Sequence, residues 1–291
     1  MKKPIFRGAG VAIITPYTED GVNFPELGRI IEDQIEKGTD AVVITGTTGE
    51  SATMTDEEHR ATIKFAVDQV KGRIPVIAGT GSNETAYAVE LSQYAEKVGA
   101  DAVLVVTPYY SKPPADALLE HFVMVADATD LPVMLYDIPG RSGVPIATDT
   151  LIRLGAHPRI VAVKDAKNDI SGSAQVLAAT DLDYFAGDDA KVLPLLAIGG
   201  VGVIGTSTVF TGRRTAELID AWLAGNPDEA LRIYRELLPV YTGVFATQGC
   251  MLVKAGLAAR GFGPAVVRQP LLPASDQQAA AFVALLDAAG L

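Results

Sequence analysis

The sequence has little of several residue types on which particular protein classes depend. One cysteine, Cys250, is present among 291 residues, so no disulfide can form within the chain, which suits a reducing compartment. A lone cysteine can be a nucleophile, but a buried structural thiol is commoner. Basic residues are also scarce: 24 Lys and Arg stand against 35 Asp and Glu, for a net charge of −11. This balance, without a basic cluster, argues against a nucleic-acid partner.

Histidines and long apolar runs are scarce as well. His59 and His121 fall within helical patterns and His157 precedes an expected strand, so none shares a strand end with a pair of carboxylates. The sequence therefore predicts no metal centre and no metal cofactor. No apolar run reaches the roughly 18 residues that span a bilayer. Because the charged start, residues 1–8, has no apolar signal segment, we expect a cytoplasmic protein without a membrane partner.

Eight short apolar runs recur along the chain, and a helical pattern follows each of them. They lie at residues 10–16, 41–45, 75–79, 102–107, 132–136, 160–164, 184–187 and 202–206. The runs are continuously apolar rather than alternating, which is typical of parallel strands buried on both faces. Between them, apolar stripes such as Leu27, Ile30, Ile31 and Ile35 indicate amphipathic helices.

Eight strand–helix repeats predict an α/β protein with a (β/α)8 TIM barrel. A doubly wound open sheet is the alternative, but its glycine-rich loop should follow the first strand, whereas here Gly8 precedes the first expected strand and Gly10 begins it. After Thr206 only helical patterns remain. We therefore expect a barrel domain over residues 1–225 and a small C-terminal helical extension over residues 226–291.

Lys164 is the strongest functional signal, because it ends the sixth expected strand. Barrel active sites lie at the C-terminal ends of the strands. A lysine that points into the barrel loses hydration, which lowers its pKa and makes its amine nucleophilic. The alternative is a lysine that reaches solvent or pairs with Asp165 or Asp188. This strand by itself leaves both readings open.

Two other expected strand ends, those of residues 41–45 and 132–136, carry groups that an imine-forming lysine needs. The Gly-Thr-Thr-Gly loop at residues 46–49 offers backbone N–H groups to an anion. Thr48 and Tyr136 offer hydroxyls for proton transfer, and Arg141 offers a fork for a second carboxylate. Each feature alone has an ordinary reading: a tight turn, a core tyrosine or a surface arginine. Together they favour Schiff-base catalysis.

These motifs resemble one known family. Residues 46–51, Tyr109-Tyr110, residues 136–143 and Lys164-Asp165 are similar to the dihydrodipicolinate synthase family of the N-acetylneuraminate lyase superfamily. The resemblance runs over essentially the whole chain. It implies an enzyme of lysine and diaminopimelate biosynthesis that condenses pyruvate with L-aspartate 4-semialdehyde and needs no cofactor.

The resemblance also implies a role for each matching residue. Lys164 would form the imine, Thr47 and Thr48 would hold the pyruvate carboxylate, and Arg141 would bind the aldehyde substrate. Thr48, Tyr136 and Tyr110 would form a proton relay, with Tyr110 supplied by the neighbouring subunit. Gly187 and Ile204 would line the site. The family is usually a homotetramer built as a dimer of dimers.

Two alternative functions remain open. A lyase or aldolase for a sugar acid or a 4-hydroxy-2-oxo acid would share the lysine, but sialic-acid lyases generally lack an arginine at the position of Arg141. Arginine also suits an anionic aldehyde better than a neutral polyol. A non-catalytic barrel that binds a keto acid is the other alternative, and the presence of both Lys164 and Tyr136 argues against it.

The chain departs from the family pattern in two places. Many members follow the lysine with Glu-Ala-Ser/Thr-Gly, whereas this chain has Asp165-Ala166-Lys167-Asn168, and the role of Lys167 is open. Lysine-sensitive relatives bind lysine at an effector site near the dimer interface. The corresponding positions here are Ser51, Ala52, Asp56, His59, Asn83, Tyr87 and Tyr109. Asp56 and Tyr87 differ from the sensitive form, which has an acid in place of the tyrosine, so we expect weak or absent inhibition by lysine.

Overall fold

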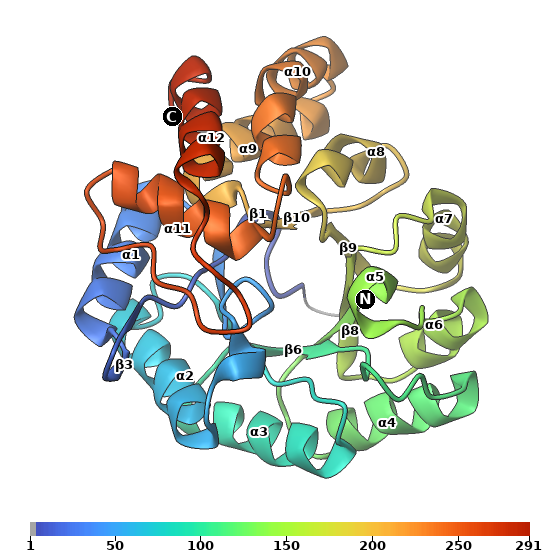
Figure 1. Cartoon of the computed structure of the whole chain (residues 1–291). Coiled ribbons are helices and arrows are strands. Elements are labelled where there is room, and N and C mark those ends of the chain that lie inside the picture. Colours follow the sequence, from blue (N-terminus) through green and yellow to red (C-terminus); the bar gives the residue numbers. More distant parts are fainter. Residues whose placement is uncertain (1–3) are drawn as a thin grey trace.

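A closed ring of eight parallel strands forms the centre of the molecule (Figure 1). The structure is a computed structural model that describes residues 4–291. The barrel strands are β1 (Gly8–Ala12), β4 (Ala41–Ile44), β5 (Val76–Gly79), β6 (Ala102–Val106), β7 (Val133–Asp137), β8 (Ile160–Asp165), β9 (Asp183–Ala186) and β10 (Gly202–Gly205). Each pairs with its neighbours in chain order, and β1 pairs with β10 to close the ring. The predicted TIM barrel is confirmed.

Helices surround this ring on all sides in Figure 1. Those that follow the strands are α1 (Phe24–Glu36), α2 (Asp56–Val70), α3 (Thr85–Val98), α4 (Ala115–Asp127), α5 (Pro139–Ser142), α6 (Thr148–Gly155), α7 (Ile170–Ala179), α8 (Val192–Leu196) and α9 (Thr208–Leu223). The last three are α10 (Pro227–Gly243), α11 (Gly249–Ala259) and α12 (Asp276–Ala288). Short elements complete the chain: the hairpin β2 (Tyr17–Thr18) and β3 (Gly21–Val22), and the 3-10 turns η1 (Ser51–Thr53) and η2 (Asp189–Lys191). The predicted division near residue 225 falls between α9 and α10 and stays a prediction. No helix within residues 4–291 has both the length and the apolar character to cross a membrane.

The first strand differs from its prediction. It begins at Gly8 and ends at Ala12, whereas residues 10–16 were expected, so Gly8 also lies inside the strand. Glycine is required inside this strand because the Phe6 ring occupies the space beside it: a Cβ on Gly10 would lie 2.8 Å from that ring. Phe6 in turn stacks on Phe185 of β9 with ring centroids 4.4 Å apart. A glycine in this strand thus leaves room for the aromatic side chain that fills the barrel.

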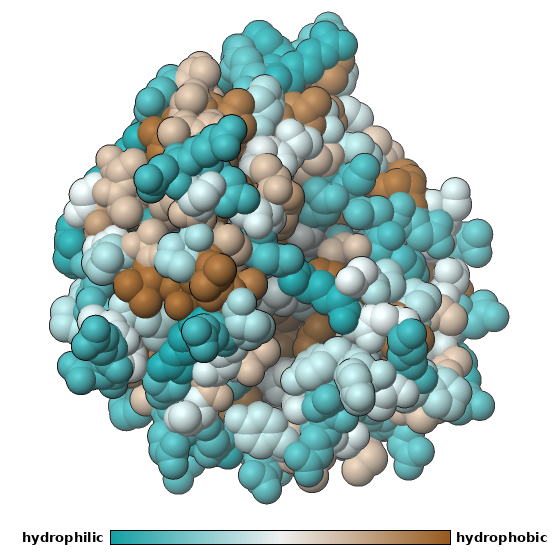
Figure 2. Space-filling view, in the orientation of Figure 1, coloured by the Kyte–Doolittle hydropathy of each residue, from teal (hydrophilic) through white to brown (hydrophobic). Residues whose placement is uncertain are grey.

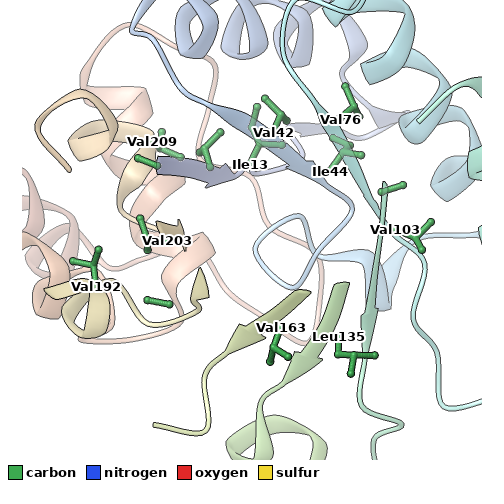
Figure 3. Close-up of a cluster of buried hydrophobic side chains, with 14 of the residues drawn as sticks. Ile13, Val42, Ile44, Val76, Val103, Leu135, Val163, Val192, Val203 and Val209 are labelled. Atoms are coloured by element: carbon green, nitrogen blue, oxygen red, sulfur yellow. The ribbon is translucent and has the colours of Figure 1, made fainter. Parts of the chain in front are cut away.

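Alternation along the strands sorts the buried side chains into two layers. The inner layer fills the barrel and includes Ile77, Leu104, Met134, Phe185 and Ile204. The outer layer packs between strands and helices, and Figure 3 shows part of it. Its labelled strand residues include Val42, Ile44, Val76, Val103, Leu135, Val163 and Val203. Because side chains alternate, neighbouring residues at the top of one strand face opposite layers.

A buried ion pair connects the loop after β4 to α11. Lys254 donates to the Glu50 carboxylate, and the two residues are only 3% and 6% exposed. Lys254 Nζ also donates to the Val266 carbonyl at 2.7 Å, and the Arg268 N–H donates to Glu50 at 3.0 Å. The Tyr17 ring lies beside both cations, 4.5 Å from Lys254 Nζ and 4.2 Å from the Arg268 guanidinium. The segment between α11 and α12 is therefore tied to the loop that precedes η1.

Breaking this pair should destabilise the protein strongly. Lys254→Met keeps the length of the side chain but leaves the Glu50 carboxylate buried without its cation, so we expect a loss of about 3–5 kcal/mol in the free energy of unfolding. Urea denaturation measures the loss. Lys64→Met, which removes the exposed cation of a pair with Asp68 on α2, is the control and should change little. The double variant Glu50→Gln with Lys254→Met should recover part of the stability. Equal effects of the two single Lys→Met variants would contradict the assignment.

Candidate active site

A cavity of about 350 Å³ opens at the C-terminal mouth of the barrel. In Figure 2 the same face shows a hollow near its centre, with hydrophobic side chains inside and hydrophilic ones around it. The cavity brings together five of the predicted catalytic and substrate-binding residues, Thr47, Thr48, Tyr136, Arg141 and Gly187, and one predicted effector residue, Ala52. It also has a wall that the sequence did not predict, formed by the C-terminal residues Phe245, Gln248, Cys250, Pro270 and Leu271.

Lys164 lies below this cavity, on the inner face of β8. The β7–β8 register sets it beside Tyr136, and its Nζ lies 4.3 Å from the centroid of the Tyr136 ring. Lys164 is 4% exposed, and none of the ion pairs within residues 4–291 involves it. Asp165 faces the other side of the strand and accepts from Ser173, so the alternative pairing with Asp165 is wrong. Burial lowers the pKa of Lys164 to about 8, opposed by the charge of Asp189 and aided by Arg141.

Asp189 holds the end of β10 in place. Its carboxylate accepts from the backbone N–H of Thr206 at 3.0 Å and of Ser207 at 2.8 Å, and from the Ser207 hydroxyl at 2.5 Å. Three donors satisfy a carboxylate that is 1% exposed. Asp189 thereby fixes Thr206, whose side chain lines the cavity. Neither was among the predicted site residues, although Thr206 ends an expected strand and Asp189 lies two residues after another.

The two threonines of the loop at residues 46–49 have different hydroxyl partners. The Thr47 side chain is near enough to Tyr136 to lower the pKa of its hydroxyl, while Thr48 Oγ1 lies 3.2 Å from Thr206 Oγ1. Burial raises the pKa of Tyr136 to about 12, so this hydroxyl keeps its proton near neutral pH. The prediction placed Thr48 in the relay with Tyr136; the structure instead puts Thr47 next to it. Among the hydrogen bonds of residues 4–291, none uses the backbone N–H of Thr47 or Thr48, so both can bind an anion.

Arg141 lies at the cavity mouth on α5. Its side chain is exposed and donates to Gln248 Oε1 at 3.0 Å, so the contact joins the loop after β7 to the start of α11. Gly187 lies beside Lys164, and a Cβ there would come 3.1 Å from Lys164 Cγ. Ile204 lies in the inner core layer, fully buried, and is not part of the cavity wall.

Tyr110 does not reach the cavity of its own chain. Its side chain is 90% exposed and its backbone has a left-handed φ of 74°. A non-glycine residue in this conformation is uncommon. One chain therefore does not complete the relay that the resemblance implies, and the role of Tyr110 stays a prediction.

The predicted effector positions lie around the start of α2. Ser51 and Ala52 are in η1, Asp56 and His59 are in α2, Tyr87 is in α3, and Asn83 and Tyr109 are in loops. The Asp56 carboxylate already has two partners: Arg60 Nε lies 2.8 and 2.9 Å from its oxygens, and the Tyr87 hydroxyl donates to it. His59 Nε2 hydrogen-bonds to the Gly79 carbonyl at 2.8 Å.

Cys250 lies in the cavity wall, but burial raises the pKa of its thiol to about 11. A thiol with this pKa is a poor nucleophile near neutral pH, which favours the structural reading. Within residues 4–291 no three His, Cys, Asp or Glu side chains gather in an arrangement that could hold a metal ion.

Comparison with known proteins matches this chain to one family. The model of the dihydrodipicolinate synthetase family covers residues 5–289. The chain belongs to this family. A member from Cutibacterium acnes, named 4-hydroxy-tetrahydrodipicolinate synthase, is 52% identical over 289 residues, which is 99% of each chain. A second with the same name, from Acidothermus cellulolyticus, is 51% identical over 96% of this chain and 91% of its own.

A solved family structure has the same fold over the full length. The chloride-inhibited dihydrodipicolinate synthase from Acinetobacter baumannii, complexed with pyruvate, superposes with a TM-score of 0.94 at 35% identity. The match covers 98% of this chain and 99% of that one.

The pKa of Lys164 predicts how the reactivity of the chain depends on pH. Only the neutral amine attacks a ketone, so the rate of pyruvate imine formation should rise with pH up to about 8 and level off above it. Pyruvate trapping by cyanoborohydride across this range, followed by mass spectrometry of the Lys164 peptide, measures the rate. Lys164→Arg should give no adduct. A midpoint near the ordinary lysine value of about 10.4 would show that the amine is not desolvated.

Proposed function

We propose that this chain condenses pyruvate with L-aspartate 4-semialdehyde through an imine on Lys164, as its relatives' name implies. The observation that carries the proposal is the placement of Lys164: buried, without an ion-pair partner among residues 4–291, and beside Tyr136 under the cavity. Such an amine is nucleophilic near neutral pH, and the cavity above it is of the size of small-molecule sites.

The reaction proceeds in four steps. The Lys164 amine attacks the ketone carbon of pyruvate, and loss of water gives the imine. Loss of a proton from the methyl group gives the enamine, whose carbon attacks the aldehyde carbon of the semialdehyde and forms an alkoxide that takes up a proton. The amino group of the adduct then attacks the imine carbon. This closes the ring and expels the Lys164 amine, so the enzyme is regenerated without a net oxidation or reduction.

The loop at residues 46–49 and Tyr136 assist these steps. Because the N–H groups of Thr47 and Thr48 are available, we assign them to the pyruvate carboxylate. Tyr136 carries protons to and from the reacting atoms, and the effect of the Thr47 side chain on the pKa of Tyr136 supports Thr47 as the next member of the relay. Thr48, bonded to Thr206, holds the loop to the end of β10.

The last member of the relay comes from a second subunit in this proposal. The 90% exposure of Tyr110 supports that role, because the side chain is free to enter a neighbour's cavity. We accordingly propose a homotetramer arranged as a dimer of dimers and acting in the cytoplasm.

Arg141 decides the second substrate. Arg141→Ala removes the fork for the semialdehyde carboxylate, so KM for the semialdehyde should rise roughly 10- to 100-fold. A coupled assay with both substrates measures it, and pyruvate trapping on Lys164 should continue at the normal rate. Arg153→Ala, which removes an exposed arginine on α6, is the control. An equal fall in condensation and trapping would assign Arg141 another role, and a wild-type chain without condensation would favour a lyase or aldolase of the superfamily.

Lysine should inhibit this chain weakly or not at all. The carboxylate available to an incoming ammonium is that of Asp56, and Arg60 and Tyr87 already bind it. We expect an inhibition constant above about 1 mM, a binding free energy weaker than about 4 kcal/mol. Initial rates at increasing L-lysine concentrations test this, with D-lysine as the control. Submillimolar inhibition would overturn the prediction.

A further inference from the structure

Lys167 is a mostly buried lysine that the proposed mechanism does not use. It lies two residues after β8, and its side chain is 13% exposed. Its Nζ donates to the Ile146 carbonyl at 3.0 Å and lies 3.3 Å from Asp137 Oδ2. A lysine so little exposed normally has a specific partner, and here it has two.

Asp137 is the residue after Tyr136 and faces the outer layer. It is 1% exposed, and its Oδ1 accepts the Ile146 N–H at 3.1 Å. Its Oδ2 is buried without a hydrogen bond, so the charge of Lys167 is the main compensation for this oxygen. Asp137 and Lys167 together bind both the N–H and the C=O of Ile146. A single residue is thus held at its donor and its acceptor by an ion pair.

The contacts of Asp137 and Lys167 with Ile146, called the anchor below, close the loop that carries Arg141. The chain leaves β7 at Asp137, forms α5 with Arg141, and returns to the outer face of the same strand at Ile146. Within the loop, the Ser142 hydroxyl contacts the carbonyls of Ile138 and Val144 at 3.1 and 2.8 Å. The position of the guanidinium at the cavity mouth therefore depends on the two ends of the loop being held.

Lys167 is itself held by the end of β8. Asp165 Oδ1 accepts the backbone N–H of Lys167 at 2.8 Å and of Asn168 at 3.2 Å. The Ala166 N–H donates to the Asp137 carbonyl at 2.9 Å. The strand that presents Lys164 inward thus presents, directly after it, the cation that fixes the arginine loop.

We propose that Lys167 is a positioning residue for the second substrate: with Asp137 it anchors Ile146 and so places Arg141 to receive the carboxylate of the aldehyde. The substrate part of this inference rests on the proposed function. The anchor itself does not, because it concerns contacts within the chain.

Lys167→Met tests the inference, because methionine keeps most of the side-chain length and removes the charge. The KM for the semialdehyde should rise about tenfold, since a small displacement of a binding group is costly. The KM for pyruvate and the rate of pyruvate trapping on Lys164 should stay unchanged. Lys167→Arg keeps the positive charge and should retain most of the affinity. Lys191→Met, at the neighbouring strand end, is the control.

The pH profile gives a readout that a purely structural role would not change. Burial raises the pKa of Asp137 to about 6, opposed by Lys167. The other titratable groups near it are Asp165 on β8 and Tyr184 on β9. In the wild type the KM for the semialdehyde should rise as the pH falls through about 6, because Asp137 loses its charge. In Lys167→Met the same rise should occur at higher pH, because the opposing cation is gone.

Hydrogen–deuterium exchange separates failure of this inference from failure of the proposed function. Peptides covering residues 138–147 should exchange faster in Lys167→Met than in the wild type, whatever the substrate. Unchanged exchange overturns the anchor, even in an enzyme that condenses the two substrates. Faster exchange with an unchanged KM for the semialdehyde overturns the positioning role. A wild type that does not use the semialdehyde overturns the substrate assignment, and faster exchange would then still support the anchor.

Discussion

The strict alternation of side chains along parallel strands is the constraint on which this site depends. At the ends of β7 and β8, Tyr136 and Lys164 face the barrel interior, while Asp137 and Asp165 face the outer layer. From Met134 onward the register pairs β7 with β8 residue by residue, so Tyr136 lies beside Lys164 and Asp137 lies beside Asp165. The inner pair carries the proposed chemistry and the outer pair organises the loops. A slip of one residue would exchange these roles.

Sequence reasoning predicted the barrel well because its signal is local and repeated. Each strand is a short apolar run followed by an amphipathic helix, and eight repeats leave few alternatives to a closed ring. The sequence also narrowed the placement of Lys164 to two possibilities, because a side chain at the end of a barrel strand points either into the barrel or toward the surrounding helices. The sequence alone could not decide between them. In the structure Lys164 is paired with Tyr136 and its side chain points into the barrel. Asp165, the next residue, points outward and accepts a hydrogen bond from the Ser173 hydroxyl.

What the sequence could not predict depends on contacts between distant segments. The wall formed by Gln248 and Leu271 comes from more than 100 residues after Arg141, and no local pattern marks it. The sequence could not show that Thr48, predicted to act with Tyr136, has the Thr206 hydroxyl as its partner, because adjacent residues in a tight loop diverge according to its three-dimensional path. The start of β1 was misplaced because glycine is a weak strand former. A glycine is required at residue 10 because any larger side chain would collide with the Phe6 ring.

The ion pair between Glu50 and Lys254 limits how this barrel can be recombined with others. The C-terminal helices supply one side of the cavity, and the same segment neutralises a buried carboxylate three residues from Thr47. A hybrid joined at residue 225 to the tail of another barrel would need a matching cation as well as a matching wall. The loop at residues 46–49 and the C-terminal helices therefore have to be exchanged as one unit.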